Sequence, residues 1–380
     1  MSLVLGEEQL MLQDSAREFC RENAPIKVMR RLRDSHDSLG YDPQIWTQIV
    51  ALGWPGMAIP EAYGGYDFGY TGLGLVLEET GRCLLNSPLI STVLLCASAI
   101  RIGGTEEQKK KLLPQVVAGS LLLALAIDEA PHHQPSRVAL LARKTGSGFT
   151  LNGGSKRFVL DGHIANKFIV SARTSGEVSS STGISLFVVD ADTPGVKVTR
   201  QWMVDSRNSA SLEFNNVQLG HDALLGEQDK GLPLLQQVLD IGCIGVAAEM
   251  LGSAQEVLDR TIDFLKQREQ FGVPIGAFQG LQHRAAIMFA DLELCRSAVR
   301  AALHALDHDP PAVPALASLV KARVGDTFFT ISNEGVQMHG GVGMTDEFDI
   351  GFFLKRARVA QQFLGDEFFH RDRYAALNGF

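Results

Sequence analysis

The clearest pattern in the chain is a seam of apolar and small residues in its C-terminal part. These residues recur at alternating spacings of four and three: Leu281, Ala285, Met288, Leu292, Cys295, Val299, Ala302 and Leu306. Such spacing puts side chains on one helix face and is typical of helices that pack together. Similar periodicity predicts further helices over residues 251–265, 314–331 and 350–363. Long helices with short links indicate an antiparallel four-helix bundle.

Between residues 122 and 226 the pattern changes to short strands. The runs RFVL, KFIVSA, ISLFVV, VKVTR and SLEF are rich in β-branched and aromatic residues. Turn-forming pairs such as Asn152-Gly153 and Asp161-Gly162 separate them. Helical patterns are missing between these runs, which disfavours a parallel βαβ sheet. We therefore expect an antiparallel sandwich or barrel.

The first ~120 residues are expected to be helical. Asp42 and Pro43 are typical of an N-cap and first helical position, and Gly53 of a helix end. Thr105 and Gln108 have the spacing of a capping box. The turn-rich stretch 59–72 lies between these helices. The order of helices, strands and helices predicts an α+β chain with domains at 1–121, 122–228 and 229–380.

Composition narrows the function. The 380 residues include 43 acidic and 35 basic side chains, so the net charge of −8 disfavours binding to nucleic acid. The five cysteines are widely spaced, which favours a reducing compartment. The first residues lack the pattern of a signal peptide. The longest unbroken apolar run, 121–127, is too short to span a bilayer. We expect a soluble, cytoplasmic protein without membrane insertion.

Several common sites are absent from the sequence. It contains no GxSxG nucleophile elbow, no phosphate-binding P-loop and no complete dinucleotide fingerprint. Two histidine pairs are candidates for metal ligands: His132 with His133, adjacent in a loop, and His304 with His308, whose i, i+4 spacing on a helix can bind a metal. No carboxylate or cysteine lies near the second pair in a recognisable ligand pattern. We therefore interpret all four as solvent-facing histidines and expect no metal site.

Two glycine-containing polar clusters remain. The first is REQFG at 268–272, followed by Phe278 and Gln279, and the second is QMHGGVG at 337–343. Glycines allow backbone N–H groups to approach a pyrophosphate, and an arginine supplies a fixed positive charge. Taken alone, each cluster is more often a turn between two helices than a cofactor site.

Taken together, the motifs are more specific. PEAYGG at 60–65, LNGGSKRFVLDG at 151–162, DTPGVKV at 192–198 and LLGEQDKG at 224–231 precede QREQFGVPIGAFQGLQHRAA at 267–286 and QMHGGVG at 337–343. With these stretches the chain resembles the acyl-CoA dehydrogenase family over nearly its whole length. The resemblance implies a helical domain, a β domain and a four-helix bundle, in agreement with the periodicity.

The resemblance also implies FAD as the cofactor. The positions that match flavin contacts are Asp128, Phe158, Leu160, Arg268, Phe271, Gln279, Gln337, His339, Gly340 and Gly341. Arg268 and Phe271 match contacts to the ADP half, and the 337–341 loop matches one that closes on the diphosphate of a neighbouring subunit. Phe158 and Leu160 stand where the family usually has Trp and Thr beside the isoalloxazine ring, so a hydroxyl contact is lost.

The implied reaction removes two hydrogens across Cα–Cβ of an acyl-CoA thioester, as in fatty acid metabolism. A carboxylate takes the α-proton, and the β-hydrogen leaves as hydride to flavin N5. This chain departs from the family at the base. Leu364 and Gly242 occupy the two positions that hold the glutamate in different members. Asp240 and Cys243 match substrate-side positions, with Cys243 replacing an arginine. Asp128 replaces a flavin-contacting threonine, and the Gly-Ser that seats the thioester is missing.

Three hypotheses follow for the missing base. In the first, another carboxylate takes over. Asp366, with Glu367 beside it, and Glu249 are the candidates, although a helix N-cap and a buried structural pair are the alternatives for Asp366 and Glu249. In the second, the chain is the base-less subunit of a heteromeric dehydrogenase. In the third, it binds flavin or acyl-CoA without dehydrogenation. The family also implies electron-transfer flavoprotein as the oxidant and a homotetramer or heterotetramer.

Overall fold

The computed structural model describes residues 4–380. The expectation of no signal peptide rests on the first residues of the chain, which lie partly outside this range. An N-terminal helical region, a central β region and a C-terminal helical region follow one another, which confirms the α+β class. The chain divides into two compact units. The helical unit comprises residues 4–31, Tyr70–Leu85 and Cys243–Phe380, and the mixed unit comprises Leu32–Gly69 and Asn86–Gly242.

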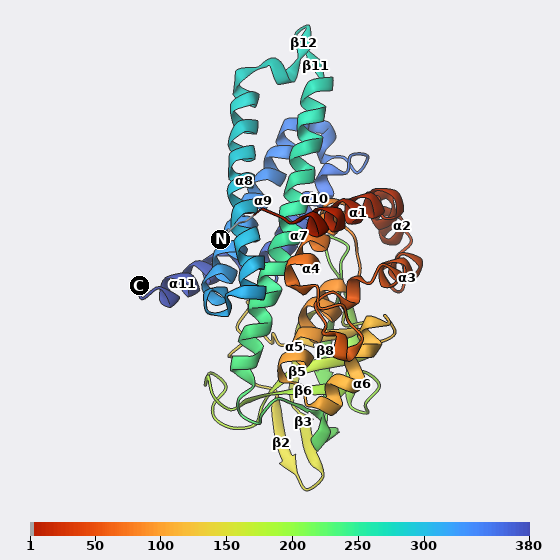
Figure 1. The fold of residues 1–380 in the computed structure, drawn as a ribbon, viewed down its shortest axis with the longest axis vertical. Helices are drawn as coiled ribbons and strands as arrows, with labels where there is room; N and C mark the ends of the chain where they lie inside the picture. The colour runs from red at the N-terminus through yellow and green to blue at the C-terminus, as the bar shows by residue number, and fades with distance from the viewer. Residues whose placement is uncertain (1–3) are drawn as a thin grey trace. The chain divides into compact units, whose positions relative to one another are not determined.

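Long helices form the helical unit (Figure 1). They are α1 (Glu7–Asn23), α4 (Gly69–Arg82), α8 (Gln279–His308), α9 (Val313–His339), α10 (Ile350–Gln362), α11 (Glu367–Leu377) and most of α7 (Gly231–Gln267), while α2 (Ile26–Asp34) lies at the unit boundary. The seam predicted for α8 is confirmed, because Met288, Leu292 and Cys295 are buried. The middle helix, α9, packs against α8, α10 and α11.

Glycines let α4 approach α7 so closely that backbone meets backbone. A Cβ added at Gly252 of α7 would overlap the carbonyl oxygen of Glu78 in α4. A Cβ added at Gly81 of α4 would likewise overlap the carbonyl oxygen of Glu249 in α7. Ser253 adds a hydrogen bond from its Oγ to Gly81 O at 2.8 Å. Side chains are excluded at both crossing points, which makes the glycines a requirement of this packing.

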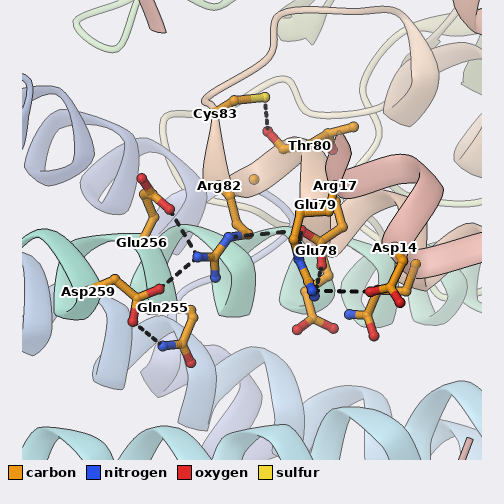
Figure 2. A network of polar contacts seen from close by, with 12 residues as sticks. Asp14, Arg17, Glu78, Glu79, Thr80, Arg82, Cys83, Gln255, Glu256 and Asp259 are labelled. Carbon is orange, nitrogen blue, oxygen red and sulfur yellow. Dashed lines mark hydrogen bonds and ion pairs between the residues drawn. The ribbon is translucent and has the colours of Figure 1, made fainter. Parts of the chain in front are cut away.

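Ion pairs join α4 to α1 and α7 (Figure 2). The carboxylate of Glu79, whose side chain is 2% exposed, lies 2.9 Å from the guanidinium of Arg17. Arg82 lies 3.1 Å from Glu256 and 2.6 Å from Asp259 in α7. Burying a carboxylate is costly unless a cation compensates its charge. This network therefore makes the position of α4 specific within the helical unit.

The mixed unit contains α3 (Pro43–Ala51), α5 (Ser98–Gly103) and α6 (Glu106–Val117), together with a π-helix at Leu89–Ala97 and the beginning of α7. Asp42 caps α3 as predicted, because its Oδ1 accepts a hydrogen bond from Gln44 N at 2.9 Å. The capping box of α6 is also confirmed. Thr105 Oγ1 accepts from Gln108 N at 3.2 Å, and Gln108 Oε1 accepts from Thr105 N at 3.0 Å. These local signals set both helix starts.

Two sheets make up the β region. The larger one contains β1 (Leu123–Ala126), β2 (Leu141–Thr145), β3 (Gly148–Asn152), β5 (Lys167–Arg173), β6 (Ile184–Asp190), β9 (Val217–Gly220) and β10 (Leu224–Leu225). The smaller has the order β4 (Gly154–Leu160), β8 (Asn208–Phe214), β7 (Val196–Trp202). Phe149, Phe168, Phe187 and Phe214 belong to the shared hydrophobic core.

The larger sheet is mixed, so the prediction of an antiparallel arrangement is wrong for two pairings. β1 and β2 both run parallel to β5, whereas the other pairings of this sheet are antiparallel. The physical reason lies in the connections. The chain leaves the larger sheet for β4 before it returns as β5. A hairpin dictates antiparallel pairing, whereas a longer crossover allows parallel pairing.

One helix in the described range 4–380, α7, is long and apolar enough to cross a membrane by length and composition. A search for unbroken apolar runs overlooks it because polar residues interrupt the helix. In the structure 89% of its most apolar window is buried. A helix that is apolar on most sides and covered by protein is typical of a core element.

Candidate functional site

The connection between α7 and α8 exposes aromatic rings beside an arginine. A two-strand hairpin, β11 (Glu269–Gln270) with β12 (Val273–Pro274), forms its tip (Figure 1). Phe271, at φ +55°, is 93% exposed, and its ring centroid lies 6.2 Å from that of Phe278, which is 40% exposed. Arg268 is exposed and has no carboxylate partner within residues 4–380. Gln279, the first residue of α8, is exposed as well.

The second glycine cluster begins where α9 ends. Gly340 has φ +65°, and a Cβ at Gly340 or Gly341 would meet no atom within 4 Å, so both backbones border open space. Gln337 is exposed. His339, in contrast, is 7% exposed and its Nδ1 donates to Gly335 O at 2.7 Å. Burial lowers the pKa of His339, which favours the neutral imidazole.

The two clusters lie at the same end of the helical unit. The ring of His339 stacks on that of Phe264 with centroids 4.3 Å apart. Phe264 is one helical turn before Arg268, and its carbonyl accepts from Arg268 N at 2.9 Å. Sequence reasoning named both clusters but did not place Phe264 between them. The sequence signal that could have indicated this contact is Phe264 itself, an aromatic residue one helical turn before Arg268.

In the mixed unit, β4 carries Phe158 and Leu160 next to an irregularity. The register between β4 and β8 shifts between Lys156 and Val159. Phe158 lies inside this bulge at φ +52°, and its side chain is 45% exposed. A β-bulge with a left-handed residue changes the direction of that residue's side chain relative to a regular strand, here the side chain of Phe158. Leu160, the last residue of β4, is half-buried.

The loop after β1 runs beside this bulge. The carbonyl oxygen of Asp128 accepts from Arg157 N at 2.8 Å, one residue before Phe158. Asp128 Oδ2 lies 2.9 Å from His133 Nδ1, and Asp128 Oδ1 accepts from Gln134 N at 3.2 Å. The side chain of His133 is 5% exposed. The interpretation of His133 as a solvent-facing histidine is therefore wrong, because the loop folds its ring onto Asp128.

A buried lysine braces the same loop, and sequence reasoning missed it. Lys156 Nζ donates to Glu129 Oε1 at 2.7 Å and to Ile127 O at 3.1 Å. Glu129 in turn accepts from Ala139 N at 2.8 Å and from Leu140 N. Burial lowers the pKa of Lys156. The pair thus ties both ends of the loop between β1 and β2 together.

Leu364 lies in a strained turn between α10 and α11. It is 4% exposed and has φ +61°, and Gly365 follows with φ +101°. His370 Nε2 donates to Leu364 O at 2.9 Å, and Cys243 Sγ lies 3.9 Å from the same oxygen. Lys321 Nζ donates to Gly365 O at 2.8 Å. Side chains from α7, α9 and α11 therefore contact the backbone of this turn. The contacts bring together Cys243, a predicted substrate-side position, and Leu364, the predicted base position.

The two candidate carboxylates have structural partners. Asp366 Oδ1 accepts from Phe369 N at 2.9 Å, so the N-cap interpretation of Asp366 is confirmed. Glu249 is 2% exposed, and its Oε1 lies 3.7 Å from the guanidinium of Arg356, which is 1% exposed. Asp240, on the α7 segment that belongs to the mixed unit, is 4% exposed. As catalytic or substrate-binding groups all three stay predictions.

These features fit a dinucleotide cofactor such as FAD. Within the helical unit, Arg268 supplies a positive charge without a carboxylate partner among residues 4–380, Phe271 supplies exposed aromatic surface, and Gly340 and Gly341 expose their backbones to open space. A phosphate is bound by a cation or by backbone N–H groups, and an aromatic ring system is covered by another aromatic surface. Residues 4–380 contain no group of three or more His, Cys, Asp or Glu side chains that could hold a metal ion.

Comparison with known proteins identifies the family. Three family models match in order: acyl-CoA dehydrogenase, N-terminal domain, over residues 6–120; middle domain, over 134–217; and C-terminal domain, over 229–376. The mitochondrial isovaleryl-CoA dehydrogenase of Pongo abelii is 31% identical over 363 residues, which are 93% of this chain and 85% of that protein.

Solved structures agree. Butyryl-CoA dehydrogenase from Megasphaera elsdenii has a TM-score of 0.89 and 29% identity, and the match covers 99% of each chain. A chain from the structure of the electron transferring flavoprotein of Acidaminococcus fermentans has a TM-score of 0.91 and 28% identity, with 100% of each chain covered. The chain therefore belongs to the acyl-CoA dehydrogenase family, whose members are FAD-dependent oxidoreductases that act on the CH–CH bond of acyl-CoA.

Proposed function

We propose that this protein is an acyl-CoA dehydrogenase that introduces an α,β double bond into an acyl-CoA thioester. The observation that carries the proposal is the exposed cluster of Arg268, Phe271 and Phe278 at the α7–α8 tip. Exposing two aromatic rings to water is unfavourable unless a partner covers them, and a cation without a carboxylate is suited to a phosphate. The ADP half of FAD has both chemistries.

The remaining cofactor contacts follow the family positions. Gln279 joins Arg268 and Phe271 on the nucleotide. The loop with Gln337, His339, Gly340 and Gly341 closes on the diphosphate of a neighbouring subunit, chiefly through its backbone, because the His339 ring packs inward. Phe158, Leu160 and Asp128 lie on the flavin side.

When bound, FAD would supply the two-electron acceptor for the β-hydrogen. The chain's own residues bind the thioester, keep water out and take the α-proton. Asp240 and Cys243 are the proposed substrate-side positions. An α C–H bond is weakly acidic, so the reaction needs a base at contact distance and donors for the thioester oxygen.

A second candidate function is that of a base-less subunit in a heteromeric dehydrogenase, or of a flavin- or acyl-CoA-binding protein without dehydrogenation. One observation favours it: Leu364, at the usual base position, is a buried leucine that cannot accept a proton. Asp366 and Glu249 remain candidate replacements, although the first caps α11 and the second pairs with Arg356.

Assembly and context complete the proposal. Ile287, Phe289 and Leu294 of α8 are each more than half exposed, which supports a contact between copies in a homotetramer or heterotetramer. We further propose a four-helix bundle of α7–α10, a barrel-like closure of the two sheets, domains at 1–121, 122–228 and 229–380, and a cytoplasmic role in fatty acid metabolism. Electron-transfer flavoprotein is the proposed oxidant.

The test is to purify the chain alone and record its flavin spectrum. Saturated acyl-CoAs from butyryl-CoA to palmitoyl-CoA, and a branched acyl-CoA, are then added anaerobically. We expect bound flavin that one or more of these thioesters bleaches. Bleaching that appears only after a related subunit is added would support the heteromeric alternative. Purification without flavin, and failure to rebind added FAD, would contradict the cofactor assignment.

A further inference from the structure

We propose that Phe264 of α7 is a positioning residue for FAD, because its ring fixes the glycine turn Gly340–Met344 at a set distance from Arg268. This inference rests on the proposed cofactor site, and it adds a residue that is not among the flavin contacts expected from the family. Phe264 does not touch the cofactor itself; it acts through His339, on which its ring is stacked. All of these residues belong to the helical unit.

The glycine turn, which directly follows α9, depends on support from other residues. Gly340 has φ +65°, and a Cβ at Gly340 or Gly341 would meet no described atom within 4 Å. The side chains of Val342 and Met344 are exposed. Glycine loses more conformational freedom on ordering than any other residue. Such a turn therefore presents its N–H groups at fixed places only if neighbouring side chains hold it.

An aromatic cluster of Phe264, His339 and Phe348 supplies this support. His339, the residue before the turn, stacks on Phe264 with ring centroids 4.3 Å apart and 25° between the planes. Phe348, shortly after the turn, meets both rings edge-on, with its centroid 6.3 Å from that of Phe264 and 6.2 Å from that of His339. Stacked and edge-on arrangements are both favourable. Residues on either side of the turn thus contact the same ring of α7.

His339 passes this contact on to the turn. Its Nδ1 donates to Gly335 O at 2.7 Å, which fixes the orientation of the ring. Burial lowers the pKa of His339, so the neutral imidazole packs as an aromatic group. A Cβ added at Gly343 would lie 2.9 Å from the Cβ of His339, so the turn packs directly onto this residue.

The backbone of α7 connects the cluster to the arginine. Arg268 N donates to Phe264 O at 2.9 Å, and Arg268 O accepts from Ile275 N at 2.8 Å, which closes the hairpin. A helix rises about 1.5 Å per residue, so Arg268 lies about 6 Å along the axis from Phe264 and on the same face. The place of Arg268 is thus set relative to the ring that holds the glycine turn.

An ion pair one helical turn earlier on α7 reinforces this arrangement. Arg260 lies 3.0 Å from the carboxylate of Asp349, the residue after Phe348. Arg30 of α2 lies 2.9 Å from the same carboxylate. Arg260 and Phe264 share a face of α7 because they are four positions apart. Two consecutive residues after the glycine turn therefore contact two consecutive turns of one helix, which fixes the register of the glycine turn as well as its distance.

The cofactor needs this spacing because it has to reach both clusters at once. In the proposed site its ADP half lies on Arg268 and Phe271, and its diphosphate lies on the glycine turn. Contacts that are held at the right separation before binding cost less to order than contacts that must be brought together. Removing the ring of Phe264 keeps every proposed contact in the chain and takes away only the fixed distance between them.

The test measures the release of FAD and needs no turnover. The flavin-loaded protein is diluted into buffer without FAD, and the rise of flavin fluorescence gives the release rate. We expect Phe264→Leu to speed release by about 5-fold or more, the effect of losing two aromatic contacts of ordinary strength. Phe264→Tyr keeps the ring and should stay within about twofold of wild type. Phe348→Leu opens the same cluster from its other side, should also speed release, and is the second variant should Phe264→Leu fail to fold.

Phe328→Leu is the matched control for general destabilisation. Phe328 is fully buried in α9, about 16 Å along the helix axis from His339. The same substitution there should lower the melting temperature at least as much as Phe264→Leu, while the release rate stays within about twofold of wild type. Release as fast as in Phe264→Leu would show that lost stability alone frees the cofactor, and would overturn the proposal.

A double-mutant cycle with Arg268→Met separates positioning from a structural role. If Phe264 sets the place of Arg268, loss of the arginine should speed release less in the Phe264→Leu background than in wild type. Strictly additive effects would overturn the inference, as would wild-type release in both Phe264→Leu and Phe348→Leu. In those cases bound flavin still upholds the proposed function, whereas a wild type that binds no flavin contradicts the function and this inference together.

Discussion

Lys321 Nζ, fully buried in α9, donates a hydrogen bond to the carbonyl oxygen of Gly365 at 2.8 Å. The same ammonium group donates to Gln361 O at 2.8 Å. It thereby joins the end of α10 to the left-handed turn that carries Leu364. Burial lowers the pKa of Lys321 to about 8, and the charges of Cys243, Asp366 and Glu367 oppose this shift.

This lowered pKa predicts a pH dependence of stability. Between a folded pKa of about 8 and an unfolded value of 10.5, the unfolded chain binds a proton that the native lysine has lost. The free energy of unfolding should therefore rise with pH across this window, by up to about 1.4 kcal/mol per pH unit, and the rise should be absent below it. Urea unfolding of wild type and Lys321→Met from pH 7 to 10.5 measures the difference. Lys266→Met, at an exposed lysine of α7, is the control and should keep the wild-type slope.

Leu364→Glu should supply a base at the turn. His370 holds the carbonyl of Leu364 itself and Lys321 holds that of Gly365, so a new carboxylate at position 364 would have a fixed backbone. When the flavin-loaded protein is incubated with a saturated acyl-CoA in D2O, we expect Leu364→Glu to raise the rate of deuterium uptake at Cα by at least about 10-fold over wild type, within the range of general-base effects. Leu364→Gln has the same shape without the charge and should produce no gain. Equal rates for the two variants would argue against this position as a base site.

Two substitutions of Asp366 can separate its role as the N-cap of α11 from a role as the catalytic base. Asparagine is also a good N-cap, whereas alanine is not. Asp366→Asn should leave both stability and flavin bleaching near wild type, and Asp366→Ala should lower the free energy of unfolding by about 1 kcal/mol. Thermal unfolding and anaerobic bleaching test the two effects. Loss of bleaching in Asp366→Asn with unchanged stability would instead identify Asp366 as the base.

Glu249 and Arg356 form a buried pair, so removing one partner leaves an uncompensated charge. We expect Glu249→Gln or Arg356→Met to lower the free energy of unfolding by about 3–5 kcal/mol. The double variant should recover much of that loss, because both charges are then gone. Urea unfolding of the four proteins forms a double-mutant cycle. Strictly additive losses would show that the two residues do not interact.

Two helical glycines should respond to alanine in opposite directions. Gly252 of α7 faces the Glu78 carbonyl of α4, so Gly252→Ala should destabilise by about 1–3 kcal/mol, as overpacking does. Gly280 of α8 has no neighbour within 4 Å of an added Cβ. Gly280→Ala should stabilise by up to about 1 kcal/mol, the difference in helix propensity. Thermal unfolding measures both, and destabilisation at Gly280 would contradict the open space found there.

Local patterns account for most of what could be predicted about the fold. The seam from Met288 to Ala302 faces the interior of the helical unit, and the Asp42 and Thr105 caps begin the helices expected of them. The β-branched runs fall in β4 to β8. Each of these signals acts within a few residues, where backbone geometry alone decides which side chains share a face.

The sequence alone thus determined the order of helices and strands, the helix starts and the clusters around Arg268 and Gly340. Tertiary structure decided the parallel pairing of β1 with β5 and the burial of His133 against Asp128. It also decided the hydrogen bond from Lys321 to the carbonyl of Gly365, which lies 44 residues further along the chain. The burial of His133 shows the reason. His132 and His133 are identical neighbours in a loop without periodicity, and the path of that loop depends on contacts such as the Lys156–Glu129 pair, whose residues are 27 apart. Contacts across such separations depend on the packing of the whole chain, which no local pattern encodes.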